Sequence, residues 1–284
     1  MKVNILSLSG HRIDELLADY AHTALKNHDV HEFHRNGTLT DKTFDALWVF
    51  NGLHDTQRST AIVNASKKIP TLYFHDDISL PTFTSMTTIS QFEGMSNHHF
   101  QISELAVFDK KWEKVPTAHK GFDFCYWGHK KPEREKNYDK YIYPMDRKTS
   151  MFIGDFKGNL SLNIAYERDM NRLHKYISHS KFTVVFGDKH HNGKSIPLRV
   201  YEAAMNGVSV LFDKDLVENQ AYFTINPKFV VESNEDFFIP DYEEFKTELL
   251  KGTIEDARER VLSNLETLLE ITSQQVRKKR GTIN

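Results

Sequence analysis

Short apolar runs alternate with amphipathic stretches along most of the chain. The runs are rich in β-branched and aromatic residues, as is typical of buried strands. They cover residues 2–8, 28–33, 45–50, 71–74, 122–127, 150–153, 162–166, 182–186, 208–212 and 229–231. Apolar residues recur with helical spacing at residues 13–26, 56–67, 169–179, 198–206, 242–250 and 254–279. Strands that alternate with helices in this way predict right-handed βαβ units and parallel sheets, and hence an α/β fold.

The alternation weakens once, between residues 82 and 119, where threonine, serine and lysine are frequent. A chain of 284 residues has room for two domains of ordinary size, each with its own core. We therefore predict two successive Rossmann-like domains, at residues 1–116 and 117–260. Residues 261–284 are expected to form a C-terminal helix.

The composition narrows the class of protein. The chain is 39% hydrophobic and 27% charged, contains no apolar run of membrane-spanning length and is expected to have no signal peptide. Its single cysteine, Cys125, excludes a disulfide framework, fits a reducing cytosol and lies in an apolar run typical of a core. The net charge of −2 gives no overall attraction to nucleic acid, so any contact with DNA must use local basic patches.

Residues 186–202 carry the clearest candidate for binding chemistry. An apolar run ends at Phe186, a polar loop rich in Gly, His and Lys follows, and a helix is predicted to begin at Pro197, where a missing N–H is tolerated. Strand, loop and helix N-terminus together predict an anion site. Arg199 and Glu202 are three residues apart, so they project from one face of the helix. An arginine suits a diphosphate and a carboxylate suits ribose hydroxyls, although an ordinary surface ion pair explains the spacing equally well.

The segment GDKHHNGKSIPLRVYE, residues 187–202, resembles the donor-binding segment of the phage DNA β-glucosyltransferases. That family moves glucose from UDP-glucose onto 5-hydroxymethylcytosine in DNA. It has the GT-B fold, in which two Rossmann-like domains face each other across a central cleft and the C-terminal helix crosses back. With gaps, the resemblance extends to four segments and most of the chain, although the first domain looks shorter than the family's. It implies a DNA acceptor domain at residues 1–116 and a nucleotide-sugar domain at residues 117–260.

A second matching segment contains the strand at residues 122–128 and the turn HKKPERE after it. It is similar to the family's strand, glycine turn and two diphosphate-binding arginines. Gly128 permits close approach of a ligand to the backbone, and His129 follows it in the implied donor site. Lys131 and Arg134 stand at the two arginine positions, with a one-residue gap. Lys131 keeps the charge but lacks the planar fork of arginine, and a solvated charged turn is the alternative interpretation.

The resemblance also implies further residues at the donor site, beside Arg199 and Glu202. His191 stands where the family has a tyrosine that contacts the phosphates, and an imidazole can donate a similar hydrogen bond. Arg168 lies near the segment whose backbone reads uracil in the family.

The segment HDDISLP, residues 75–81, resembles the family's DIRLP-type segment, whose aspartate is the general base. Asp77 matches this aspartate by its Ile-x-Leu-Pro context, and Asp76 is the runner-up. A capping or turn role is the alternative for both. Glu15 aligns with a family glutamate near the sugar and the acceptor, and Asp14 is the alternative there. A single base with direct displacement implies inversion at the anomeric carbon.

The implied partners are a UDP-sugar and double-stranded DNA with a hydroxymethylated pyrimidine, which must be flipped out of the duplex to be reached. Basic residues expected to contact DNA are Lys110, Lys111, Lys114, Lys120, Lys130 and residues 277–280. We expect a monomer in the cytoplasm of an infected bacterial cell.

Other functions and cofactors stay open at this point. A GT-B enzyme with a small-molecule, glycan or protein acceptor would share the donor segments, and a binding module without catalysis is a third hypothesis. The sequence leaves open whether Mg²⁺ or Mn²⁺ assists. The 15 histidines lack HExxH or zinc-finger spacing, so no zinc site is expected.

Overall fold

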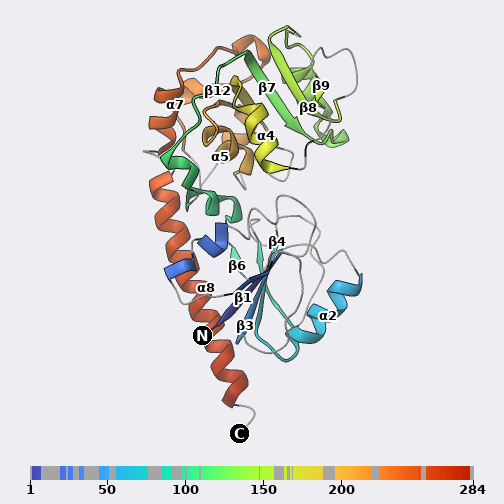
Figure 1. Ribbon diagram of the computed structural model, residues 1–284, viewed down its shortest axis with the longest axis vertical. Coiled ribbons are helices and arrows are strands. Elements are labelled where there is room, and N and C mark those ends of the chain that lie inside the picture. The colour runs from blue at the N-terminus through green and yellow to red at the C-terminus, as the bar shows by residue number, and fades with distance from the viewer. Residues whose placement is uncertain are drawn as a thin grey trace. The chain divides into compact units, whose positions relative to one another are not determined.

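The structure is a computed structural model of the 284-residue chain, shown in Figure 1. It describes residues 2–7, 20–23, 25–27, 32–34, 45–50, 56–75, 85–90, 98–99, 101–108, 110–146, 148–156, 163–164, 167, 169–187, 196–218, 224–250 and 254–281. The chain forms two compact units. Unit 1 contains Met1–Asp109 together with Arg258–Asn284, and unit 2 contains Lys110–Ala257.

Unit 1 is built on a six-stranded parallel sheet in the order β2-β1-β3-β4-β5-β6. Its strands are β1 Val3–Ser7, β2 Glu32–His34, β3 Ala46–Phe50, β4 Thr71–His75, β5 Thr87–Ser90 and β6 His98–His99. Its helices are α2 Thr56–Ser66, the 3₁₀ helices η1 Leu25–Asn27 and η2 Ile102–Phe108, and most of α8, which spans Glu255–Gly281.

Helices on both faces explain why the central strands are apolar throughout. Leu47 and Val49 of β3 belong to one buried cluster with Ile62 of α2. Trp48 lies between them in sequence and points to the other face, where its indole N–H donates to Thr272 Oγ1 of α8 at 3.3 Å. Every residue of β3 is therefore buried, as expected for a parallel sheet covered on both sides.

Helix α8 is held to unit 1 by polar contacts along its length. The Arg260 guanidinium donates to Glu104 Oε1 of η2 at 2.7 Å, and Gln275 Nε2 donates to Thr87 Oγ1 at 2.8 Å. At its basic end, Lys279 donates to the Ser66 carbonyl at 3.0 Å, and burial lowers the pKa of this lysine. The last turns of the chain thus belong to the same unit as its first strands.

Unit 2 contains a second six-stranded parallel sheet, in the order β12-β11-β10-β7-β8-β9. The strands are β7 Phe122–Gly128, β8 Ser150–Gly154, β9 Asn163–Ile164, β10 Ser180–Val185, β11 Ser209–Asp213 and β12 Val230–Val231. The α-helices are α3 Glu135–Asn137, α4 Met170–Ile177, α5 Leu198–Ala204, α6 Lys214–Val217 and α7 Tyr242–Leu249. Short 3₁₀ helices are η3 Lys110–Glu113, η4 Pro132–Arg134, η6 Pro227–Phe229 and η7 Asn234–Asp236, and η5 Tyr138–Ile142 is a π-helix.

Aromatic side chains fill the core of unit 2 beneath the carboxyl ends of its strands. The ring of Tyr126 stacks on Phe186 at 5.2 Å and meets Tyr138 and Phe156 edge-on at 6.1 and 5.3 Å. Cys125, the residue before Tyr126, is fully buried, and this burial raises the pKa of its thiol to about 12. The thiol is therefore a core group, as its apolar surroundings in the sequence indicate.

The predicted α/β fold with two parallel sheets is confirmed, and two local predictions need correction. The irregular stretch at residues 82–119 contains β5, which pairs between β4 and β6, and the edge strand β6, and both are too short to show a repeat in the sequence. Pro197 is the N-cap of α5 and not its first helical residue, with an extended ψ of 134°. In the described part of the chain, no helix combines the length and apolarity needed to cross a membrane.

The buried carboxyl group of Glu104 predicts a pH-dependent stability. Burial raises its pKa from 4.5 to about 7, against the smaller opposite effect of Arg260. Between these pH values the folded chain holds a proton that the unfolded chain releases, so the free energy of unfolding should fall as the pH rises from 4.5 to 7. We expect a loss of about 3 kcal/mol over this interval. Denaturant unfolding of the Glu104→Gln variant should lack this component.

Glu266→Gln is the matched control, since Glu266 is exposed on α8. It should keep the pH dependence of the unmodified chain. If Glu104→Gln has the same pH dependence as the unmodified chain, Glu104 is ionised in the folded state and the prediction is wrong.

Candidate functional site

The strand order of unit 2 indicates at which strand ends a ligand would be expected to bind. From β7 the chain continues to β8 and β9 on one side, and β10 then pairs with the other edge of β7 and leads to β11 and β12. In parallel α/β sheets, ligands bind outside the carboxyl ends of the strands where the order reverses in this way. The segments that follow β7 at Gly128 and β10 at Val185 both leave the sheet at this point.

Arg199 of α5 is fixed against the end of β7. Its Nη2 donates to the Trp127 carbonyl at 2.6 Å, and its Nη1 donates to the Tyr126 hydroxyl at 2.9 Å. The guanidinium also lies over the Tyr126 ring, 4.5 Å from its centroid. Its Nε is buried and has no hydrogen-bond partner among the described residues. The orientation of this cation is therefore set before any ligand arrives.

Glu202 approaches the same strand end from one turn further along α5. Its side chain is 5% exposed, and its Oε2 accepts a hydrogen bond from the Trp127 indole N–H at 3.3 Å. Arg199 and Glu202 thus share the face of α5 that meets Trp127, as their spacing predicts. Because Glu202 is buried, an ordinary surface ion pair does not describe this arrangement.

Two glycines let neighbouring backbones come together at this edge. Gly128 and Gly154 are partners across β7 and β8, with φ values of +128° and +139°. A Cβ on Gly128 would lie 2.9 Å from Arg199 Nη2, and a Cβ on Gly154 would lie 1.9 Å from the Gly128 carbonyl oxygen. Both positions therefore need glycine, and Gly128 leaves the space that the guanidinium occupies.

The turn after Gly128 carries the other predicted donor-site residues that the structure describes. His129 Nδ1 lies 2.7 Å from Asp155 Oδ2, and both side chains are about half exposed, at 54% and 53%. Lys131 is exposed, and its backbone N–H donates to the Tyr138 hydroxyl at 3.1 Å. Arg134, in η4, is half-buried. The structure therefore groups Gly128, Arg199 and Glu202 around Trp127, with the turn of His129, Lys131 and Arg134 following on.

Several predicted residues lie outside the described residues. These are Glu15, Asp76, Asp77, Arg168 and His191, and the side chain of Lys110. The strands that lead to two of these segments are described: β4 ends at His75 and β10 ends at Val185.

The lysines expected to contact DNA differ in their surroundings. Lys114 is exposed. Lys130 pairs with Glu135 at 3.1 Å, and Lys111 Nζ contacts His174 Nδ1 of α4. Lys111 and Lys130 thus have interactions within unit 2 that compete with an external phosphate.

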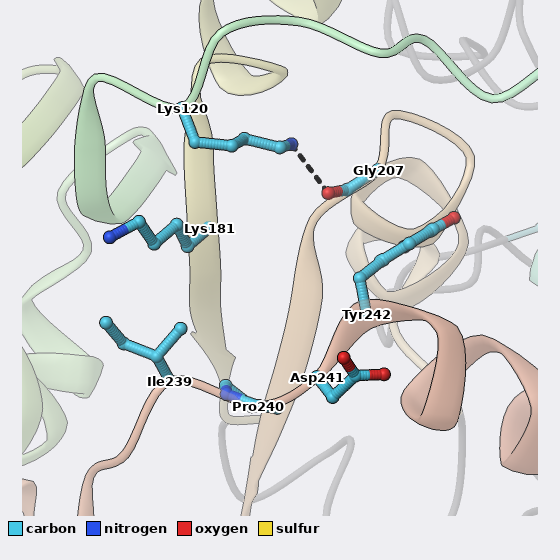
Figure 2. Close-up of a pocket in the computed structure, with 7 residues that line it drawn as sticks. All are labelled: Lys120, Lys181, Gly207, Ile239, Pro240, Asp241 and Tyr242. Atoms are coloured by element: carbon cyan, nitrogen blue, oxygen red, sulfur yellow. Dashed lines mark hydrogen bonds between the residues drawn. The ribbon is translucent and has the colours of Figure 1, made fainter.

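Lys120 lies before the amino end of β7, whereas Gly128 lies at its carboxyl end. Its ammonium donates to the carbonyls of Ser178 and Gly207 at 2.9 and 2.6 Å, and burial lowers its pKa. A pocket of about 380 Å³ lies here, near the amino ends of the strands. It is lined by Lys120, Lys181, Gly207, Ile239, Pro240, Asp241 and Tyr242, which Figure 2 shows. The expectation that Lys120 contacts DNA is not supported by this position, because its charge satisfies backbone groups of its own unit.

Sequence reasoning missed the aromatic partners of the site. The Tyr126 hydroxyl and the Trp127 carbonyl bind Arg199. The Trp127 indole binds Glu202, and the Tyr138 hydroxyl binds the Lys131 backbone. In the sequence Tyr126 and Trp127 look like core residues of a strand, and Tyr138 lies in no predicted element; all three rings are buried. The only available signal was the position of Tyr126 and Trp127 immediately before a glycine at the end of an apolar run.

No family model and no curated protein matches this sequence. Solved structures do match it over its whole length. One is T4 phage β-glucosyltransferase, with a TM-score of 0.64 at 16% identity, covering 100% of both chains. Another is T4 phage BGT in complex with its UDP-glucose substrate, with a TM-score of 0.65 at 17% identity, covering 100% of this chain and 98% of that one.

A third match is an α-glucosyltransferase in complex with UDP and a 13-mer DNA containing a central A:G mismatch. Its TM-score is 0.55 at 13% identity, and it covers 96% of this chain and 100% of that one. At these identities the likeness concerns the fold, and it confirms the predicted GT-B fold class.

Gly154 at the site and Gly207, which lies outside it before β11, predict unequal effects of an added methyl group. Gly154→Ala should reduce the free energy of unfolding by more than about 3 kcal/mol, since strain at positive φ adds to a clash with backbone. Gly207→Ala should cost less, because its φ of +73° is also strained for alanine but its Cβ would lie 3.1 Å from the nearest atom, the Pro116 carbonyl oxygen, and not 1.9 Å. Denaturant unfolding of both variants checks this. Equal losses would mean that the approach of β8 to Gly128 is not a tight constraint.

Proposed function

We propose that this chain is a glycosyltransferase that moves a sugar, in the simplest case glucose, from a UDP-sugar to the hydroxymethyl group of a 5-hydroxymethylpyrimidine in DNA. The observation that carries the proposal is the joint placement of Arg199 and Glu202 on Trp127, at the strand-order reversal of unit 2. The GT-B fold and the matches to structures with bound UDP-glucose, and with UDP and DNA, support it.

The donor diphosphate would lie between Arg199 and the turn after Gly128. Arg199 has five N–H donors, and the described contacts with Tyr126 and Trp127 use one on each terminal nitrogen. The second N–H of each terminal nitrogen can donate to phosphate oxygens, with the charge held in a fixed orientation. Lys131 and Arg134 would add positive charge from the turn, and His191 a hydrogen bond.

Glu202 would bind the ribose of the donor. A carboxylate offers about four acceptor sites, and the Trp127 indole N–H takes one of them. Carboxylate oxygens suit the two vicinal hydroxyls of a ribose, which a phosphate ligand without a ribose does not have. Arg168 would lie near the uracil, where the backbone of the neighbouring segment reads the base. This division of roles favours a nucleotide diphosphate over a simple anion.

In the chemical step, Asp77 would take the proton of the acceptor hydroxymethyl group. The acceptor oxygen then forms a bond to the anomeric carbon as the bond from that carbon to the diphosphate oxygen breaks. UDP leaves with the bonding electron pair, and its new negative charge is stabilised by Arg199 and Lys131. Glu15 would lie near the sugar and the acceptor. A single displacement inverts the configuration of the anomeric carbon.

A divalent cation is compatible with the proposal but has no assigned step. One matching structure is a complex of T4 phage BGT with UDP and Mn²⁺. Among the described residues of this chain, no three His, Cys, Asp or Glu side chains are grouped to hold a metal ion. The roles proposed above for the protein residues do not depend on a cation.

A GT-B enzyme with a non-DNA acceptor is the second candidate, because its donor site would be the same. The direct test is to incubate the protein with several UDP-sugars and with duplexes containing hydroxymethylcytosine, hydroxymethyluracil or neither, followed by nucleoside mass spectrometry. Transfer that requires the hydroxymethyl group supports the proposal. UDP binding without transfer to any duplex would favour the second candidate.

Arg199→Ala should weaken UDP binding by a factor on the order of 10 to 100, since a charge-assisted hydrogen bond contributes about 1.5–3 kcal/mol. Arg199→Lys should fall between, because it keeps the charge and loses the fork. Arg172→Ala, an exposed arginine on α4, is the matched control and should bind UDP normally. Calorimetry with UDP measures all three. Unchanged affinity in Arg199→Ala would remove this residue from the donor site.

Asp77→Asn should bind UDP and DNA nearly normally but transfer sugar about 10²–10⁴ times more slowly, because the amide keeps the shape and loses the proton acceptor. Asp76→Asn should be milder. Single-turnover transfer and the anomeric configuration of the product are the measurements. Full activity in Asp77→Asn with an inactive Asp76→Asn would move the base to Asp76, and activity in both would reject the catalytic role of this segment.

A further inference from the structure

The helical stretch at residues 137–142 fastens together the strand ends that surround the donor site. Asn137 Nδ2 donates to the Gly187 carbonyl at 3.1 Å, just after β10. The Tyr141 hydroxyl donates to the Val231 carbonyl at the end of β12 at 3.1 Å and contacts Asp213 Oδ1 at the end of β11. This short stretch thus contacts the chain at the carboxyl ends of β10, β11 and β12.

The stretch is wound as a π-helix, in which the Tyr143 N–H donates to the Tyr138 carbonyl at 2.9 Å, five residues back. Such turns are rare in regular structure and occur frequently at functional sites. In this case the winding accompanies the burial of Tyr138, Tyr141 and Ile142 against the sheet.

Tyr138 is the member that reaches the turn after Gly128. Its ring is fully buried and packs edge-on against Phe186 at 5.8 Å. Its hydroxyl accepts the Lys131 backbone N–H at 3.1 Å and donates to the His129 carbonyl at 3.4 Å. Burial raises the pKa of this hydroxyl to about 12, so it keeps its proton near neutral pH. One side chain therefore closes the turn from both ends.

We propose that Tyr138 is a positioning residue for the donor diphosphate, acting through the turn of residues 129–131. The inference rests on the proposed function, because it assigns to the turn the diphosphate contact made there. With the hydroxyl present, the turn is ordered before the donor binds. Without it, the Lys131 N–H and the His129 carbonyl lose a shared partner, and ordering the turn becomes part of the cost of donor binding. The chemical step does not involve Tyr138, so turnover at saturating donor should change little.

Tyr138→Phe removes the hydroxyl and keeps the buried ring. Tyr242→Phe is the matched control, since the Tyr242 hydroxyl also donates to a backbone carbonyl, that of Ala204 at 2.6 Å. Tyr242 lines the pocket of Figure 2, near the opposite ends of the strands. We expect Tyr138→Phe to raise the Kd for UDP and the KM for the UDP-sugar about fivefold to tenfold, with kcat within about twofold. Tyr242→Phe should leave all three unchanged, while both variants lose a similar amount of thermal stability.

Amide hydrogen exchange without ligand gives a second, independent readout. The Lys131 amide should exchange faster in Tyr138→Phe than in the unmodified chain or in Tyr242→Phe. If the unmodified chain binds UDP and Tyr138→Phe binds it equally well, the positioning role is wrong and the proposed function stands. Equal loss of UDP affinity in both variants also overturns the role, since it would reflect general stability. If the unmodified chain does not bind UDP, the proposed function itself fails, and this inference fails with it.

Discussion

The contact between Arg199 and the end of β7 is the interaction on which the rest of the candidate site depends. A half-buried guanidinium loses part of its hydration, which is compensated by the Trp127 carbonyl, the Tyr126 hydroxyl and the faces of both rings. The contact requires that residue 128 has no side chain, since a Cβ there would meet Nη2 at 2.9 Å. It also fixes the first turn of α5, and with it Glu202. In the proposed function, this one cation would set where the diphosphate and the ribose of the donor are held.

The sequence pattern predicted the parallel sheets because burial on both faces leaves a simple signature, a run of apolar residues without alternation. β3 and β10 have this signature and were found. β5 and β6 were missed because four and two residues are too few to show a pattern: Thr87–Ser90 is held by pairing between β4 and β6, and His98–His99 by pairing with β5 at the edge of the sheet. The π-helix at Tyr138–Ile142 was missed for a different reason, since it has no repeat long enough to produce a period.

The candidate site was predictable only where chemistry and spacing coincide. Arg199 and Glu202 stand three apart at a helix start, so their common face follows from helical geometry alone. Their partner Trp127 lies 72 residues before Arg199 and 75 before Glu202, and nothing in the sequence indicates that its carbonyl and indole N–H serve both. The same applies to Tyr138, whose ring has the pattern of a core residue while its hydroxyl closes a backbone turn. Tyrosine and tryptophan can pack in the core and hydrogen-bond at a site with the same side chain, so a sequence pattern that marks them as core residues hides the second role.

The cations of the proposed donor site also differ in what they could contribute. Lys131 is exposed, so its attraction to a diphosphate is screened by salt and helps mainly to bring the donor in. Arg199 is half-buried and already oriented by two hydrogen bonds and two rings, so its interaction with developing charge is screened less and requires no rearrangement. If UDP is the leaving group, the charge that appears on its phosphate in the transition state is best met by the fixed cation. A lysine at position 131 then suffices, although it lacks the planar guanidinium of an arginine, because only Arg199 has to meet the phosphate in a fixed geometry.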